Sequence, residues 1–397
     1  MIIELKGVEF DNKGSALMLQ SILVALRSRY PDIEFALSAN IKSPASARHQ
    51  VARYRKVTLR KLYLDLNRLT YRLPRCVSAF LKKRGVVFEG QVDAIIDASG
   101  FAYSDQWSPY MSLYHLAGEI ARCHNANKPY IFLPQAFGPF SEARCQALLA
   151  KSLPKAALVC ARDSASHQHL EQISGALPQL VQAKDFTNIL KPTPYAWPDL
   201  FTETADVPKA CIVVNVNMAT PKNKNKGWLT RYTDMILHSI HVYQEQGLFP
   251  FFLNHEGAGD ARMITQLNAL LSVPLPVIAP VDALTVKQVI ASSDAVLSSR
   301  FHGCVSALSS GIPCLGTSWS HKYEALYEDY QVPHLLLSPE LTDTELADII
   351  KQSLAPTLCK KVAERADELL AETDTLWQKV YGILDPINGH NNVEPSA

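Results

Sequence analysis

Residues 295–316 read AVLSSRFHGCVSALSSGIPCLG, and this stretch decides the fold. Apolar residues 295–298 predict a buried strand, residues 305–310 predict a helix of small residues, and residues 313–316 predict a second strand. Two strands joined by a helix form a parallel unit with a right-handed crossover. The stretch therefore predicts an α/β protein built on parallel sheets.

Strand-like and helix-like runs alternate over nearly the whole chain on both sides of this stretch. Between residues 187 and 208 the alternation stops, and four prolines punctuate a run without periodicity, as in a linker. We expect a Rossmann-like domain in residues 1–190, a linker in 191–208 and a second Rossmann-like domain in 209–385, both doubly wound. A polar tail, 386–397, is expected to be disordered. Ligands of such sheets bind at the carboxyl ends of strands, which predicts an active site in the interdomain cleft.

Composition excludes several classes of protein. The chain has 397 residues, 47% of them hydrophobic, with 39 basic and 38 acidic residues, which argues against disorder and against a dedicated nucleic-acid binder. No apolar run reaches the ~20 residues that span a bilayer, and the start does not resemble a signal peptide. We therefore expect a cytoplasmic protein.

The chain lacks the common sequence signatures of cofactor and metal sites. Its eight cysteines form no CxxC pair, which favours neither a zinc site nor a disulfide framework. It contains neither GxGxxG nor GxxxxGK[ST], so a nicotinamide or P-loop nucleotide site has little support. The sequence predicts no cofactor and no metal.

The balanced net charge hides one strongly basic segment. Residues 42–84 hold 13 basic residues and one acidic residue, Asp65. Leucines at 59, 62, 66, 69 and 73 recur at helical spacing, which predicts an amphipathic helix. The segment is either a core-packed helix with a solvated basic face, or a peripheral contact with an anionic membrane.

Candidate chemical residues follow the strand at 295–298. Arg300 and His302 stand on the turn after it, and alternation along an extended turn would aim both side chains the same way. A charged Arg beside a titratable His can clamp an anion and donate a proton. The alternative is a capping turn with a structural histidine. Ser320 and Lys322, at the next junction, add a hydroxyl and a cation.

Two amino-terminal turns could hold a sugar. Asn12 and Gly14 precede the first helix, whose amides could bind an anion or a hydroxyl, although a plain turn capped by Ser15 would look the same. Ser99, Gly100 and Asp105 follow another strand, among aromatic residues that suit carbohydrate or pack in a core.

Two further positions lie where predicted strands end. Arg162 would point from a strand end toward a phosphate or carboxylate, and the alternative is a surface pair with Asp163. His255 and Glu256 follow a strand ending near residue 253 and stay candidates for a site residue.

Together these residues resemble the signature of the polysaccharide pyruvyl transferase family. Arg300-Phe301-His302-Gly303, Gly311-Ile312-Pro313 and Lys322 carry the most specific part of the resemblance. The other similar segments keep the family's order along the chain: Asn12-Lys13-Gly14, Ser99-Gly100, Gln135–Pro139, Arg162-Asp163 and Asp185-Phe186.

The resemblance implies a GT-B-like pair of domains and a transferase that forms a pyruvate ketal. Phosphoenolpyruvate would be the co-substrate, bound by Arg162, Arg300, Ser320 and Lys322, with His302, Arg300 and Arg162 as catalytic residues. A sugar of a surface or extracellular polysaccharide, or its lipid-linked oligosaccharide precursor, would be the acceptor. Acceptor contacts are expected at Asn12, Gly14, Ser99, Gly100, Asp105 and His255.

Two other functions stay open at this point. A GT-B glycosyltransferase that uses a nucleotide sugar also has a Gly-rich turn near an anion site in its carboxyl-terminal domain. A non-catalytic sugar-binding homologue would keep the fold without binding the donor.

Overall fold

The computed structural model describes residues 1–39, 45–106, 108–204, 206–221, 223, 225–280, 282–318 and 320–390. Residues 42–44 of the predicted basic segment and 391–397 of the predicted tail lie outside these ranges. The chain divides into two compact units. Unit 1 comprises Met1–Phe10, Met18–Ile189 and the end of the chain from Glu372; unit 2 comprises Asp11–Leu17 and Leu190–Ala371.

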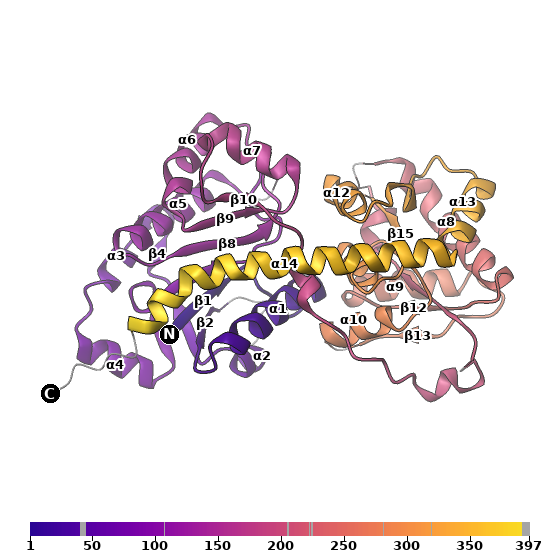
Figure 1. Ribbon diagram of the computed structural model, residues 1–397, viewed down its shortest axis with the longest axis horizontal. Helices are drawn as coiled ribbons and strands as arrows, with labels where there is room; N and C mark the ends of the chain where they lie inside the picture. Colours follow the sequence, from indigo (N-terminus) through magenta and orange to yellow (C-terminus); the bar gives the residue numbers. More distant parts are fainter. Residues whose placement is uncertain are drawn as a thin grey trace. The chain divides into compact units, whose positions relative to one another are not determined.

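Unit 1 is a Rossmann-like unit with a parallel sheet in the order β10-β9-β8-β7-β1-β2-β3-β6 (Figure 1). Its strands are β1 (Ile2–Lys6), β2 (Glu34–Ser38), β3 (Tyr54–Val57), β6 (Val86–Phe88), β7 (Ala94–Asp97), β8 (Tyr130–Gln135), β9 (Leu158–Ala161) and β10 (Leu180–Gln182). Its longer helices are α1 (Lys13–Arg29), α2 (Ala45–Val51), α5 (Tyr110–Asn125), α6 (Ala143–Ser152) and α7 (Ser164–Ser174). The strand order reverses between β1 and β7, and ligands of such sheets bind at this point.

Unit 2 repeats the arrangement with the strand order β13-β12-β11-β14-β15-β16. Its strands are β11 (Lys209–Val213), β12 (Phe249–Leu253), β13 (Val277–Ile278), β14 (Ala295–Ser298), β15 (Cys314–Thr317) and β16 (Leu336–Leu337). Its helices are α8 (Gly227–Glu245), α9 (Gly257–Asn268), α10 (Ala283–Ala291), α11 (Phe301–Leu308), α12 (His321–Asp329) and α13 (Asp343–Ser353). Residues 295–316 form β14, α11 and β15, and the two strands pair in parallel, which confirms the predicted α/β fold.

The sheet of unit 1 is buried on both faces. Along β1, Ile3 and Leu5 belong to the core beneath α1, whereas Ile2 belongs to the core beneath α5. Successive side chains of a strand point to opposite faces of the sheet, so each strand contributes side chains to both cores. This double covering explains why the strands read as continuous apolar runs.

The units do not follow the predicted domain ranges in two places. Residues 191–208, interpreted as a linker, pack on unit 2, where Trp197 lies 5.5 Å from Phe251 between ring centroids. Helix α14 (Pro356–His390) continues into unit 1. Residues 386–390, assigned to a disordered tail, are therefore helical, and Leu384 is fully buried near them.

The predicted amphipathic helix over residues 59–73 is wrong. This part of the chain forms a hairpin, β4 (Arg60–Lys61) and β5 (Leu64–Asp65), followed by short helices α3 (Asn67–Thr70) and α4 (Arg75–Lys83). Isolated helices need packing of an apolar face to persist in water, and the leucines at 62, 66 and 69 are exposed. Among the described residues, no helix is long and apolar enough to cross a membrane.

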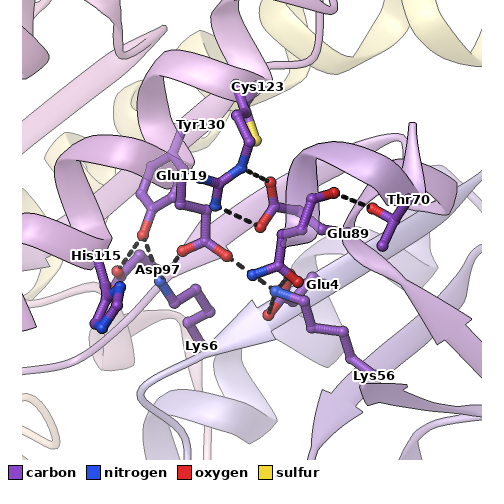
Figure 2. Close-up of polar contacts among 12 residues, drawn as sticks. Glu4, Lys6, Lys56, Thr70, Glu89, Asp97, His115, Glu119, Cys123 and Tyr130 are labelled. Carbon is purple, nitrogen blue, oxygen red and sulfur yellow. Dashed lines mark hydrogen bonds and ion pairs between the residues drawn. The ribbon is translucent and has the colours of Figure 1, made fainter. Parts of the chain in front are cut away.

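A network of buried charges lies between the sheet and α5 in unit 1 (Figure 2). Lys56 Nζ is 2.7 Å from Glu4 Oε2 and 2.9 Å from Glu119 Oε1, while Lys6 Nζ is 2.5 Å from Glu119 Oε2. Glu4, Lys56 and Glu119 are all at most 4% exposed. Charges this deeply buried are tolerated only when each is paired.

Glu4 should make the stability of unit 1 depend on pH. Burial raises the pKa of Glu4 to about 7, above its value in the unfolded chain, so the folded state retains a proton that the unfolded state releases. This contribution to stability is present at low pH and is lost as pH rises toward 7. The Glu4→Gln variant lacks it, so its melting temperature relative to wild type should rise between pH 5 and 8. A difference that stays constant over this range would contradict the prediction.

Candidate functional site

The turn between β14 and α11 is held by buried side chains from three other segments. The Ser299 carbonyl accepts hydrogen bonds from Asn215 Nδ2 at 3.2 Å and from Tyr323 Oη at 3.1 Å. Tyr232 Oη donates to Ser299 Oγ at 2.7 Å. Gly303 is required in the first turn of α11, because a Cβ there would lie 2.3 Å from Ser298 Oγ. The backbone that carries the predicted Arg300 and His302 is therefore rigid.

Arg300 is bonded to two carboxylates at the start of α9, Glu256 before the helix and Asp260 in its first turn. Its Nε and Nη2 donate to Asp260 at 3.0 and 2.7 Å, and its Nη1 donates to Glu256 at 2.5 Å. Asp260 is fully buried and also accepts the Val216 amide at 3.0 Å. These bonds use three of the five guanidinium N–H groups. The predicted anion clamp thus has two carboxylate partners, which reduce its net positive charge.

His302 lies in the first turn of α11 rather than on an extended turn. The helix begins at Phe301, so the alternation expected to aim Arg300 and His302 the same way does not apply. The His302 ring lies against Gly14, where a Cβ would stand 2.1 Å from Nδ1. Gly14 belongs to the Asp11–Leu17 segment that groups with unit 2. The Asn12-Lys13-Gly14 motif and the Arg300–Gly303 motif, far apart in the sequence, therefore meet at the His302 side chain.

His255 completes this cluster as a buried, neutral histidine. It follows β12 and is 2% exposed, and neither ring nitrogen has a hydrogen-bond partner among the described residues. Burial lowers the pKa of His255 well below its ordinary value, and the positive charges of Arg300, His302 and Lys13 act in the same direction. A neutral imidazole with both nitrogens unengaged can accept or donate a proton.

Lys322 and Ser320 stand beside the same turn. Lys322 Nζ lies 4.8 Å from the centre of the Phe301 ring, which places the cation next to the residue between Arg300 and His302. Ser320 precedes α12, and its buried Oγ has no hydrogen-bond partner in the described part of the chain. Unit 2 therefore brings together His302, Arg300, His255, Lys322 and Gly14.

Ser99 and Gly100 occupy the switch point of unit 1. Asp97, fully buried at the end of β7, accepts from Ser99 Oγ at 2.5 Å and from the Tyr103 and Tyr130 hydroxyls at 2.6 and 2.7 Å. Gly7 makes room for this loop, since its Cβ would lie 2.2 Å from the Ser99 Cα. The Ser99 hydroxyl thus donates its hydrogen bond to Asp97, and this bond fixes the loop to the end of β7.

Asp105 and Asn12 both use their side chains on the backbone. Asp105 is exposed and accepts the Ser141 amide at 3.0 and 2.8 Å. Asn12 Oδ1 accepts the Ser15 amide at 3.1 Å, and α1 begins at Lys13. The interpretation of Ser15 as the helix cap is therefore wrong, because Asn12 takes this place.

Arg162 is buried at the end of β9 in unit 1. Its Nη1 lies 3.5 Å from Asp185 Oδ2, and both side chains are 7% exposed. Asp163 instead caps α7 by accepting the Ser166 amide at 2.7 Å. The alternative of an exposed Arg162–Asp163 pair is wrong, and the pairing joins two residues of the predicted signature.

Sequence reasoning missed Asp260 and Asp97. Asp260 stands in the first turn of a helix, where a carboxylate ordinarily interacts with the helix dipole, and nothing in the sequence signals its burial against Arg300. Asp97 ends an apolar run two residues before Ser99, and this position was the available signal. No group of three His, Cys, Asp or Glu side chains in the described residues could hold a metal ion.

Solved structures show that the chain has the GT-B fold, two Rossmann-like domains. A UDP-N-acetylglucosamine 2-epimerase from Neisseria meningitidis bound to UDP-GlcNAc matches with a TM-score of 0.57 and 10% identity, covering 96% of this chain and 99% of that chain. Alr3699/HepE from Anabaena in complex with UDP and glucose matches with a TM-score of 0.53 and 15% identity, covering 99% of each chain. At these identities the likeness establishes the fold alone.

The family follows from the sequence itself. The family model for polysaccharide pyruvyl transferase matches residues 12–321, a span that contains every element of the site in unit 2 except Lys322. The chain belongs to the polysaccharide pyruvyl transferase family, a family of transferases. No curated protein sequence matches it at a significant level.

Proposed function

We propose that this protein transfers the enolpyruvyl group of phosphoenolpyruvate to two hydroxyls of one sugar, forming a pyruvate ketal and releasing phosphate. The sugar belongs to a polysaccharide or to its lipid-linked precursor. One observation carries the proposal: at the carboxyl-end edge of the unit 2 sheet, His255 after β12, Thr317 at the end of β15 and Ser320 after it carry buried polar atoms without hydrogen-bond partners among the described residues. Such atoms are rare in folded proteins and call for a ligand or water.

The charges around this turn suit a small dianion. Lys322 and Lys13 are cations of unit 2, and Arg300 retains two N–H groups beyond its carboxylate bonds. Arg300 is fixed in position by Asp260 and Glu256, so it can bind phosphate or carboxylate in one orientation without losing side-chain freedom on binding. Arg162 of unit 1 stays a predicted second contact of phosphoenolpyruvate.

His302 and His255 can divide the proton transfers. Protonated His302 gives its proton to the methylene carbon, which makes C2 electrophilic. One sugar hydroxyl adds to C2, the C2–O bond to phosphate breaks, and the second hydroxyl closes the ketal. Neutral His255 accepts the first hydroxyl proton, and the second proton restores His302. The proton held by His255 then passes to the departing phosphate.

A thermal-shift titration tests this proposal against its alternatives. A ligand that binds only the folded protein raises the melting temperature, so phosphoenolpyruvate should raise it and UDP should not. Stabilisation by UDP alone would identify a nucleotide-sugar enzyme, and stabilisation by neither would identify a non-catalytic homologue. Phosphate release that requires a sugar acceptor, with the ketal detected by mass spectrometry, completes the test.

A further inference from the structure

Residues 60–84 of unit 1 form a surface that is both basic and apolar. Fifteen large hydrophobic side chains are exposed in the described residues, and seven of them lie between Leu62 and Phe80. Residues 60–84 hold eight basic residues and one acidic residue, Asp65. We name residues 60–84 the basic apolar surface. Large apolar groups concentrated in this way usually mark a binding surface.

Helix α4 turns a mixed side of polar and apolar residues toward unit 1. None of its residues is buried, and the half-buried ones are Ser78, Leu81 and Lys82. Gln91 Nε2 donates to Ser78 Oγ at 2.6 Å, which fixes this side against the body of unit 1. Val77 and Phe80, 39% and 56% exposed, therefore face solvent. An ordinary surface helix buries its apolar face, whereas α4 leaves Val77 and Phe80 exposed to a binding partner.

The two helices are held by η1 (Glu89–Gln91), and the hairpin is held by α5 (Tyr110–Asn125). The segment η1 bonds to both helices. The Gly90 amide donates to Thr70 Oγ1 of α3 at 3.0 Å, and Gln91 Nε2 donates to Ser78 Oγ of α4. The hairpin tip is braced by Tyr63, whose ring lies 6.0 Å from that of Tyr114. In Figure 1, α3, β4 and α4 lie at one end of unit 1. The basic apolar surface is thus one continuous part of the unit.

We propose that the basic apolar surface binds the face of a lipid bilayer that contains anionic lipids. Leu62 and Leu64 at the hairpin, with Phe80 on α4, would enter the boundary between headgroups and acyl chains. The surrounding arginines and lysines would lie at the level of the anionic headgroups. A second copy of the chain is a poor occupant, since two surfaces of the same strong positive charge repel. This proposal is independent of the reaction proposed above.

Cosedimentation with vesicles tests the proposal on the wild-type chain. The protein should sediment with vesicles of phosphatidylcholine and phosphatidylserine and remain in solution with phosphatidylcholine alone. Raising the salt concentration to about 0.5 M, roughly threefold above physiological ionic strength, should reduce binding because salt screens exposed charges. Equal sedimentation with both vesicle types, or none with either, would overturn the proposal.

Two variants separate the apolar contribution from the charged one. Val77→Ser/Phe80→Ser and Arg60→Glu/Lys61→Glu/Arg68→Glu should each lower the partition coefficient at least about tenfold. Matched controls change exposed residues of unit 2: Leu270→Ser/Val273→Ser for the first and Lys191→Glu/Lys351→Glu/Lys360→Glu for the second. All the altered side chains are exposed, so melting temperatures should be unchanged. Loss of binding in the controls to the same extent as in the variants would contradict the assignment.

Discussion

Replacing Gly14 with alanine should lower acceptor-dependent phosphate release by about 100-fold or more while leaving the protein folded. The new Cβ would stand 2.1 Å from Nδ1 and 2.8 Å from Cγ of His302, so the imidazole has to leave its position. Displacing a catalytic group by about 1 Å can cost about 100-fold in rate. Alanine also favours a helix by about 1 kcal/mol relative to glycine, so helix propensity does not explain the expected loss of activity.

The matched control is Gly382→Ala, a second helical glycine. An added Cβ there meets no atom within 4 Å, so this variant should keep wild-type activity and melt slightly higher. The double variant Gly14→Ala/His302→Ala should be no less active than His302→Ala alone, because both changes act through one side chain. A double variant that is clearly worse would show that Gly14 acts by another route, for example through the amides at the start of α1.

The fold was predictable because apolar runs and small-residue turns alternate regularly. Strand β3 is hidden in the sequence by its charged residues. In β3 the pattern Tyr54-Arg55-Lys56-Val57 reads as surface, yet Lys56 is buried because Glu4 and Glu119 neutralise it. A charge that is paired across three elements cannot be recognised from its own neighbours in the sequence.

The positions of the candidate residues relative to the strands were predictable, and their interactions were less so. The sequence places Arg300 and His302 after a strand, and the structure agrees. It does not reveal that Asp260, 40 residues away, receives two bonds from Arg300, since contact between distant segments is fixed by the fold. The helix predicted from the leucines at residues 59–73 was wrong for a related reason. Helical spacing indicates which residues would share a face of a helix, and it does not indicate whether that face is buried.

Replacing Lys56 with methionine should lower the free energy of unfolding of unit 1 by about 3–5 kcal/mol. The Lys56 ammonium lies within 2.9 Å of carboxylates from both Glu4 and Glu119, all three side chains being at most 3% exposed (Figure 2). Methionine fills similar volume and offers no charge. Glu119 would keep Lys6 as a partner. The pKa of Glu4, which burial already raises to about 7, would rise further without Lys56, so Glu4 would hold its proton to higher pH or remain charged without compensation.

Hydrogen exchange of the β1 and β7 amides measures this loss in unit 1 alone, since exchange of core amides reports global opening of their unit. The pair of Arg53, which is exposed, with Glu34 provides the control: Arg53→Met should leave the exchange rates of these amides nearly unchanged, because exposed ion pairs contribute little to stability. Adding Glu4→Gln to Lys56→Met removes the carboxylate left without a partner and should recover part of the loss. If stability does not recover, Lys56 stabilises unit 1 through Glu119 or through the packing of its aliphatic chain. Glu4 would then be buried without needing Lys56 as a partner.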